Sequence, residues 1–169
     1  QIVVGGDHSV GLASLAAVLE RYNPEKVAHI QIDSHTDLHQ ITTSPSGNIH
    51  GMWLRPAVDT FLLPEMDRIV PHKLPVDNLL FIGNLVIEKE EENFLKGNAV
   101  KHFGIDELKD NLGFVDKWVN QFEHIHVSID IDAFDKSIAP ATGIPAQKGL
   151  SLEQGLAMLK IIQRQQNLS

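Results

Sequence analysis

Short apolar runs recur along the chain and alternate with stretches in which apolar residues are spaced three and four positions apart. The first pattern is typical of strands that are buried on both faces, and the second is typical of helices with one apolar side. The apolar runs predict strands over residues 2–4, 27–32, 79–82, 99–103 and 124–129.

The stretches between these runs are expected to be helical. In the helix predicted near the middle of the chain, Trp118 and Val119 fall on the apolar side and are expected in the core. The acidic stretch 88–95 is expected to be a solvated helix. Helices are predicted over residues 9–22, 51–60, 88–95, 105–122 and 151–166.

The remaining segments carry turn and loop residues. Pro64, Pro71 and Pro75 argue against long regular structure over residues 60–75. Residues 42–47 and 140–150 are rich in Ser, Pro or Gly and are expected to be loops. Ser151 is the expected N-cap of the last helix.

Strands that alternate with helices predict right-handed crossovers and a mostly parallel sheet with helices on both faces. The fold class is therefore α/β, as a three-layer α/β/α arrangement. A length of 169 residues is that of one domain of this class. The chain begins inside a predicted strand and stops soon after a helix, so we expect residues 1–169 to form a single domain that is incomplete at both ends, a piece of a longer chain.

Composition narrows the function classes. The 14 basic and 22 acidic residues give a net charge of −8, and no cluster of Lys and Arg is present, which argues against a nucleic-acid partner. Cysteine is absent, so a metal site must use oxygen and nitrogen ligands. Nothing resembles a signal peptide or a long apolar membrane span, so we expect no membrane partner and a cytoplasmic location.

Metal-ligand residue types follow three of the predicted strands. In open α/β sheets, ligands bind beyond the carboxyl ends of the strands, so these residues are expected to meet at one edge. Along an extended chain, positions i, i+2 and i+4 share a face, and three of the residues have this spacing. The residues are Asp7 and His8 after the first strand, Asp33, His35 and Asp37 after the second, and Asp130 and Asp132 after the fifth.

Each of these motifs also has an ordinary structural explanation. A carboxylate after a strand often caps a turn and faces solvent. Several carboxylates gathered at one edge raise one another's pKa unless cations neutralise them, and bound divalent metal resolves that conflict. Carboxylates with imidazoles favour Mn²⁺, with Zn²⁺, Co²⁺ and Fe²⁺ as alternatives. Bridging carboxylates predict two ions about 3.5–4 Å apart that share a nucleophilic hydroxide.

The order of the motifs resembles that of the ureohydrolase superfamily. The motifs are GGDHS, DSHTDL, SPSGNIHGM and SIDIDAFD followed by APATGIP, and they extend from Gly5 to about Glu153. The segment SGNIHG resembles most the arginase branch. The resemblance implies an arginase-like metallohydrolase domain with the arginase-like fold and a binuclear manganese site.

The resemblance also implies a ligand set for the two Mn²⁺ ions. Asp33 and Asp130 would bridge both ions, and all six family ligands are present. One ion would take His8, Asp33, Asp37 and Asp130, and the other Asp33, His35, Asp130 and Asp132.

The implied reaction is the hydrolysis of L-arginine to L-ornithine and urea, with a hydroxide that bridges the metals attacking the guanidinium carbon. A guanidinium carbon is a poor electrophile, and the leaving amine needs a proton. By position, His50 is similar to the family's proton shuttle, and Asp37 is counted as catalytic as well as metal-binding. Ser46 and Asn48 match the loop that binds the substrate α-carboxylate. Active members of the family are commonly oligomeric, so a homo-oligomer is expected.

Several positions depart from the arginase pattern. His39 stands where arginases place an Asn for the α-carboxylate. Val86 and Glu88 stand where arginases place carboxylates for the α-amino group, and only Glu88 retains one. Ile144 stands where a Thr is common. Two alternatives therefore remain: a related ureohydrolase acting on agmatine, guanidinobutyrate or formiminoglutamate, and a homologue that binds metal without turnover.

Overall fold

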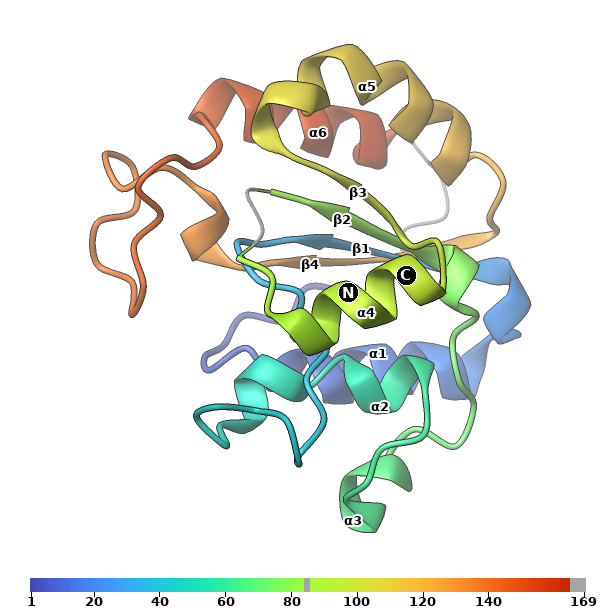
Figure 1. The fold of residues 1–169 in the computed structure, drawn as a ribbon. Helices are drawn as coiled ribbons and strands as arrows, with labels where there is room; N and C mark the ends of the chain where they lie inside the picture. The colour runs from blue at the N-terminus through green and yellow to red at the C-terminus, as the bar shows by residue number, and fades with distance from the viewer. Residues whose placement is uncertain (84–85, 165–169) are drawn as a thin grey trace.

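The protein is built on a four-stranded parallel sheet, which the computed structural model shows with residues 1–83 and 86–164 described (Figure 1). The strand order is β3-β2-β1-β4, so β1 lies between β2 and β4. β1 pairs in parallel with both neighbours. The strands are β1 (Val27–Ile32), β2 (Leu79–Ile82), β3 (Lys101–Phe103) and β4 (His124–Ile129).

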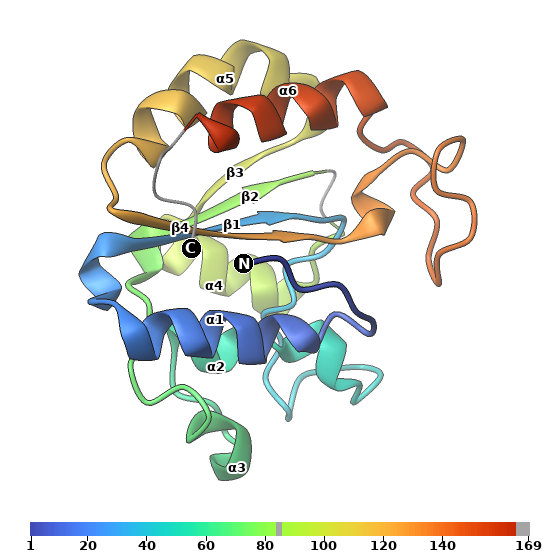
Figure 2. The same ribbon diagram turned by 180° about the vertical axis from the view of Figure 1, so that it is seen from behind.

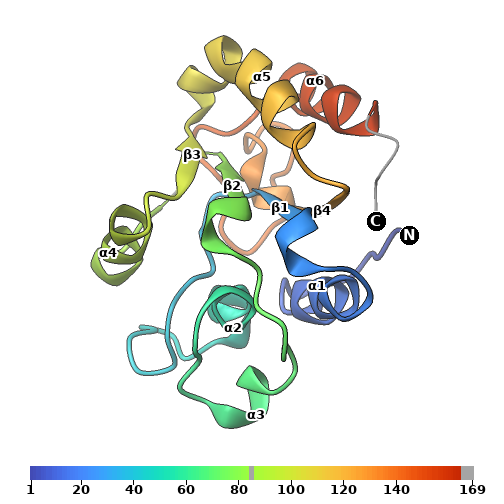
Figure 3. The ribbon, with the colours of Figure 1, turned by 90° about the vertical axis from the view of Figure 1, so that its right-hand side faces the viewer.

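Helices cover both faces of this sheet, as Figures 1 and 2 show. One layer holds α5 (Ile105–Val119) and α6 (Leu152–Gln163). The opposite layer holds α1 (Val10–Arg21), α2 (Arg55–Val58) and α4 (Lys89–Gly97), and α3 (Pro64–Asp67) lies beyond α2 (Figure 3). The predicted three-layer α/β/α fold with a parallel sheet is confirmed. Short 3₁₀ helices occupy Pro24–Lys26, Ile49–Met52, Val76–Asn78 and Ile131–Ala133.

Two apolar cores lie on the two faces of the sheet. The core toward α1, α2 and α4 contains the buried side chains of Leu15, Trp53 and Phe81. The core toward α5 and α6 contains Trp118 and Val119, which are 3% and 1% exposed, so their predicted burial is confirmed. Among residues 1–83 and 86–164, no helix is both long and apolar enough to cross a bilayer.

The strand predicted over residues 2–4 is wrong. These residues adopt no regular structure and pair with no strand in the described part of the chain. Ile2 and Val4 are 90% and 92% exposed. A run of β-branched residues favours an extended backbone, but it becomes a strand only where a neighbouring strand accepts its hydrogen bonds.

The predicted element boundaries are only partly correct. The helix expected over residues 51–60 is reduced to Ile49–Met52 and Arg55–Val58, since Pro56 interrupts backbone hydrogen bonding. The strand expected over 99–103 is shorter, and Ala99 has a positive φ of 51°. Residues 60–75 contain one helix of four residues, as their prolines predicted. Ser151 caps α6 as expected, and residues 165 and 166 of that predicted helix lie outside the described residues.

Candidate metal centre

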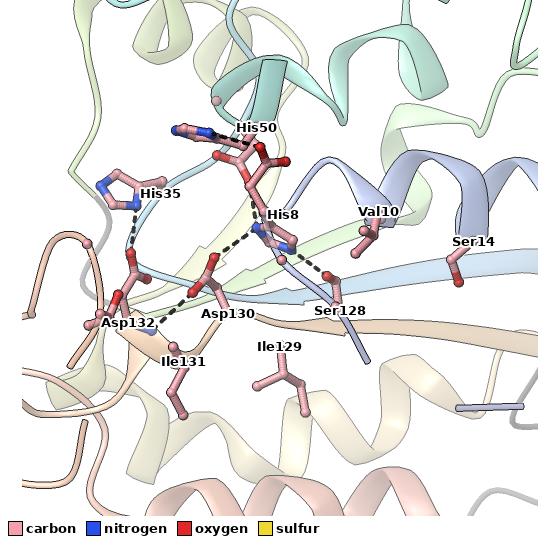
Figure 4. Close-up of a pocket in the computed structure, with 18 of the residues that line it drawn as sticks. His8, Val10, Ser14, His35, His50, Ser128, Ile129, Asp130, Ile131 and Asp132 are labelled. Atoms are coloured by element: carbon pink, nitrogen blue, oxygen red, sulfur yellow. Dashed lines mark hydrogen bonds and ion pairs between the residues drawn. The ribbon is translucent and has the colours of Figure 1, made fainter. Parts of the chain in front are cut away.

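Six side chains that the sequence predicts as metal ligands gather at the carboxyl ends of β1 and β4. Figure 4 shows four of them, His8, His35, Asp130 and Asp132. Asp33, His35 and Asp37 follow β1, and His8 lies in the turn before α1. Asp130 and Asp132 lie at the start of the 3₁₀ helix Ile131–Ala133 after β4. Because β1 and β4 are parallel neighbours, residues that are about 100 positions apart become adjacent. The six residues are His8, Asp33, His35, Asp37, Asp130 and Asp132.

The ring of His8 points into a group of three carboxylates. Its Nδ1 lies 2.9 Å from Asp37 Oδ2, 3.1 Å from Asp33 Oδ2 and 3.2 Å from Asp130 Oδ2. Its other nitrogen, Nε2, lies 2.6 Å from the hydroxyl of Ser128 on β4. Because Ser128 engages Nε2, the nitrogen turned toward the carboxylates is Nδ1.

His35 forms a second group with the carboxylates beside it. Its Nδ1 lies 3.3 Å from Asp132 Oδ2 and 3.6 Å from Asp33 Oδ1. The backbone N–H of Ser34 donates to Asp132 Oδ1 at 3.3 Å, and the Ser34 hydroxyl donates to the Asp132 carbonyl at 2.8 Å. These bonds fix the end of β1 against the segment after β4.

Asp33 belongs to both groups. One potential ligand atom from each of His8, Asp33 and Asp130 lies within 4.8 Å of the others, and the same holds for Asp33, His35 and Asp132. The Asp33 side chain is 1% exposed, and its two oxygens face the two groups separately. The arrangement therefore offers two adjacent positions for cations with a carboxylate between them.

The backbone around Asp33 requires a glycine nearby. Gly83 follows β2 with a φ of +148°, and a Cβ at this position would lie 1.9 Å from the Asp33 carbonyl oxygen. Only a residue without a side chain allows the two strand ends to approach so closely.

Asp37 has a φ of 54°, an uncommon conformation for a non-glycine residue, and it is 5% exposed.

The two histidines of the centre interact strongly with the carboxylates. Burial lowers the pKa of His8, but hydrogen bonds with Asp130, Asp33 and Asp37 outweigh it and raise that pKa to about 12. Hydrogen bonds with Asp132 and Asp33 raise the pKa of His35 to about 10. In both cases nearby negative charge favours the imidazolium, so this location also favours a bound cation.

The carboxylates differ in how well they are compensated. Burial raises the pKa of Asp37 to about 6, despite the hydrogen bond from His8, and burial also raises the pKa of Asp132. Burial would also raise the pKa of Asp33, but hydrogen bonds from His35 and His8 hold it at about 2. The hydrogen bond with His8 lowers the pKa of Asp130.

This donor set fits divalent metal ions. Four carboxylates and two imidazoles converge here. In the described part of the chain, the ion pairs of these carboxylates are with histidine and none is with Lys or Arg. Two positive charges on histidine cannot neutralise four negative ones, whereas divalent ions can. Oxygen and imidazole nitrogen without sulfur are ligands that Mn²⁺ accepts.

A cavity of about 1230 Å³ opens beside these residues. The metal-ligand candidates His8, His35 and Asp37 line it, and so do several residues that the sequence assigned to substrate contacts. The latter are His39, Ser46 and Glu88. The predicted proton shuttle His50 also lines the cavity, as do two positions that depart from the arginase pattern, Val86, which is 61% exposed, and Ile144, which is 65% exposed.

His39 contacts a pair of glutamates on one side of the cavity. Its Nε2 lies 3.4 Å from Glu91 Oε2 and 3.7 Å from Glu88 Oε2. Glu91 is 3% exposed, and it accepts hydrogen bonds from the Thr36 hydroxyl and from the Leu38 N–H. The expectation that residues 88–95 form a solvated helix is therefore wrong at Glu91, which links α4 to the segment after β1.

The loop residues lie at different places relative to this cavity. His50 is half exposed, with its Nδ1 3.8 Å from Asp7 Oδ2 (Figure 4). Ser46 lines the cavity, and its hydroxyl accepts a hydrogen bond from the backbone N–H of Asn48 at 3.2 Å. Asn48 is exposed, precedes the helix Ile49–Met52, and is not among the residues that line the cavity.

Four residues near the centre were missed from the sequence: Gln31, Trp53, Ser128 and Glu91. Trp53 donates from its indole Nε1 to Asp37 Oδ2 at 2.7 Å, and Gln31 Nε2 donates to Asp33 Oδ2 at 2.8 Å. Gln31 and Ser128 each stand on a strand, two positions before a metal-ligand candidate. That spacing puts them on the same face as the ligand and was a usable signal.

Comparisons with known proteins agree on one family. The model of the arginase family matches residues 1–169. An arginase of Entamoeba histolytica is 34% identical in an alignment 162 residues long, which covers 92% of this chain and 54% of that protein. An arginase of Staphylococcus aureus is 32% identical in an alignment 177 residues long, which covers 99% of this chain and 57% of that protein. The chain therefore spans about half the length of these relatives.

The fold agrees with the same family. The crystal structure of the Entamoeba histolytica arginase in complex with L-ornithine superposes with a TM-score of 0.90 at 31% sequence identity. The superposition covers 97% of this chain and 58% of that chain.

Proposed function

The chain belongs to the arginase family, and from this premise we propose that it is part of a manganese-dependent amidinohydrolase that converts L-arginine to L-ornithine and urea. The observation that carries the proposal is the convergence of two histidines and three aspartates around the shared Asp33, beside an open cavity. The Entamoeba histolytica relative holds L-ornithine in its crystal structure, which supports the same product for this protein.

We assign the six convergent residues to two Mn²⁺ ions. His8, Asp33, Asp37 and Asp130 would hold one ion, and Asp33, His35, Asp130 and Asp132 would hold the other. The position of Asp33 between the two groups supports its role as a bridge. Asp130 Oδ2 lies 3.2 Å from His8 Nδ1, and this contact lowers the pKa of Asp130, so its carboxylate is available as an anionic ligand.

Two bound Mn²⁺ ions would supply a nucleophile near neutral pH, because they lower the pKa of a coordinated water. The chain itself must protonate the amine that leaves the substrate carbon. We assign this to His50, because its half-exposed ring lines the cavity together with several of the ligand candidates and a histidine side chain can donate a proton. Asp37, which lines the cavity beside His8, is the carboxylate that we count as both ligand and catalytic group.

The amino-acid end of the substrate would lie toward His39, Ser46, Asn48 and Glu88. His39 and Ser46 offer groups for the α-carboxylate, and Glu88 offers a carboxylate for the α-ammonium. Glu88 is half exposed at the cavity, with its Oε2 3.7 Å from His39 Nε2, and this exposed carboxylate supports the assignment to the α-ammonium.

A related ureohydrolase is the second candidate. Val86 lines the cavity with 61% of its surface exposed, at a position where an arginase has a carboxylate for the α-amino group. A substrate without an α-amino group, such as agmatine or guanidinobutyrate, would not need that contact. The expected cytoplasmic location and homo-oligomeric assembly stay predictions.

The deciding experiment measures urea release by the full-length protein with Mn²⁺ and each substrate in turn: arginine, agmatine and guanidinobutyrate, with formiminoglutamate followed by formamide release. We expect arginine to be hydrolysed fastest. Faster hydrolysis of another substrate would assign the protein to the second candidate. Hydrolysis of none would leave a homologue that binds metal without turnover, and would overturn the proposed reaction.

A further inference from the structure

Four polar side chains lie on the face of β1 and β4 that α1 covers, next to apolar parts of the core. They form two rows across the strands, His29 with His126 and Gln31 with Ser128. His29 and Gln31 on β1 are both fully buried, and His126 on β4 is 5% exposed. In the register of β1 and β4, His29 is opposite His126 and Gln31 is opposite Ser128. The next positions on the same face, two residues further along each chain segment, are Asp33 and Asp130, so the two rows continue into the candidate metal centre.

Hydrogen bonds join three of these side chains and Ser14 of α1 into one chain, whereas Ser128 bonds to His8. Ser14 of α1 bonds to His126 Nε2 at 3.0 Å, and His126 Nδ1 lies 2.9 Å from His29 Nδ1. His29 Nε2 lies 3.4 Å from Gln31 Oε1. Gln31 Nε2 then donates to Asp33 Oδ2 at 2.8 Å and to Asp37 Oδ2 at 3.3 Å. Figure 4 shows Ser14 on α1, where the chain begins.

The chemistry of the groups sets the direction of every bond. Gln31 Oε1 only accepts, so His29 Nε2 carries a hydrogen and the neutral ring has a bare Nδ1. His126 must therefore donate from its own Nδ1, which leaves its Nε2 to accept from the Ser14 hydroxyl. All donors point toward the metal centre. The opposite orientation of the Gln31 amide would place its oxygen against two carboxylates, so the orientation with Nε2 toward them is favoured.

Both histidines of the chain are neutral near pH 7. Burial holds the pKa of His29 well below its usual range, and burial lowers the pKa of His126 to about 4. A buried and fully paired chain of neutral groups is rigid, because each group would lose its partner on moving.

We propose that Gln31 is a positioning residue of the metal centre, which holds the Asp33 and Asp37 carboxylates in place for metal binding, and that the Ser14–His126–His29 chain holds Gln31. This rests on the proposed assignment of Asp33 and Asp37 as ligands. The amide supplies neutral donors between two buried anions, so it orders them without competing for the metal as a cation would.

The test measures the affinity of the full-length protein for Mn²⁺ by calorimetric titration after removal of metal with EDTA. Gln31→Met keeps the length of the side chain and removes both polar atoms. We expect its affinity for Mn²⁺ to fall about 10- to 100-fold. The matched control is Gln40→Met, because Gln40 is also buried and paired through both polar atoms, with the Thr60 carbonyl and the Leu62 N–H. It should lose stability and keep the affinity.

A second variant tests the chain behind Gln31. His29→Leu should lower the Mn²⁺ affinity by a smaller factor, and it should cause no further loss in the Gln31→Met background, because His29 acts through Gln31. The electron paramagnetic resonance spectrum of the two bound Mn²⁺ ions should change in Gln31→Met and remain unchanged in Gln40→Met.

Wild-type affinity in folded Gln31→Met, or in His29→Leu if the first variant does not fold, would overturn the proposal. Equal losses in Gln31→Met and Gln40→Met would overturn it too, because they would reflect general destabilisation. A wild-type protein that binds Mn²⁺ and releases no urea would instead overturn the proposed function, so the two failures are distinguishable.

Discussion

The indole of Trp53 donates a hydrogen bond to Asp37 Oδ2 at 2.7 Å, so one carboxylate of the candidate metal centre is held by a residue of the apolar core. The same indole lies 5.1 Å from the His8 ring, measured between centroids. Trp53 is completely buried and packs against Gly11 of α1. The packing of α1 and the position of a metal-ligand candidate are therefore coupled through one side chain.

Trp53→Phe should weaken Mn²⁺ binding about tenfold, because a smaller aromatic ring remains in the core while the donor to Asp37 is lost. It should also lower the free energy of unfolding by about 1–3 kcal/mol, since Asp37 is buried and loses a partner. Titration with Mn²⁺ and urea denaturation measure the two effects. Trp118→Phe in the opposite core is the control and should change stability alone; equal Mn²⁺ affinities of both variants would contradict the coupling.

Gly11→Ala should destabilise the protein by about 1–3 kcal/mol, because overpacking a core forces neighbours to shift. The added Cβ would lie 2.8 Å from the Trp53 ring. Gly113→Ala in α5 is the matched control: nothing lies within 4 Å of its Cβ position, and alanine favours helix by about 0.5–1 kcal/mol. Urea denaturation should give opposite signs for the two variants. Equal stability of Gly11→Ala and wild type would show that Trp53 has room to move.

Asp130→Asn should lower both Mn²⁺ content and urea release, because an amide is a weaker ligand than a carboxylate at a position assigned to both ions. Metal content after dialysis, measured by mass spectrometry, together with a urea assay, checks this. Asp135→Asn, in the loop after β4, is the control: its carboxylate accepts from the Ser137 hydroxyl and N–H. Full occupancy by two ions in Asp130→Asn would contradict the bridging role.

His50→Ala should retain both metal ions and lower the rate of urea release by about 10²–10⁴-fold, the usual contribution of a general acid. Its ring is half exposed and forms no contact with the six ligand candidates among the ion pairs found. His72→Ala, an exposed histidine 3.8 Å from Glu20, serves as the matched control and should leave the rate unchanged. An unaltered rate in His50→Ala would remove it from the proton-transfer role.

The stability of the protein should decrease in acid partly through His126. Its pKa is about 4 in the folded protein against 6.5 as the ordinary value, so its neutral form stabilises the fold above pH 6.5. This contribution is lost as the pH falls toward 4, and amounts to about 2 kcal/mol between pH 7 and 5.

The measurement for His126 is urea denaturation at these two pH values. His126→Gln should lose less stability between them than wild type does, while His102→Gln, on the exposed side of β3, should follow wild type. Identical pH dependence of wild type and His126→Gln would show that His126 is not buried in its neutral form.

Much of the fold was predictable because local pattern and tertiary structure agree. The apolar runs at residues 27–32, 79–82 and 124–129 became β1, β2 and β4 with the predicted bounds. Residues 2–4 have the same local pattern without a pairing neighbour, and no local property distinguishes the two cases. Residues 51–60 were predicted as one helix from their helical spacing, but that spacing does not show that the chain turns at Trp53, between Ile49–Met52 and Arg55–Val58.

The site was predictable where motifs stand at strand ends, since the sheet itself brings Asp33 and Asp130 together. Supporting residues were harder to predict. Glu91 belongs to a stretch of five consecutive charged residues, 88–92, and only tertiary packing decides which of the five is buried. The contact between Trp53 and Asp37 depends on the path of residues 38–52, which no periodic pattern specifies.

The two faces of β1 have consequences for how this protein tolerates mutation. Ala28, Ile30 and Ile32 belong to the core toward α5 and α6, whereas His29 and Gln31 lie on the side of the metal centre. Selection of a random library for thermal resistance alone should therefore leave the first three positions apolar and let the other two drift toward aliphatic residues. Selection for catalysis should restore the polar pair, so one six-residue strand would record two separate selective pressures.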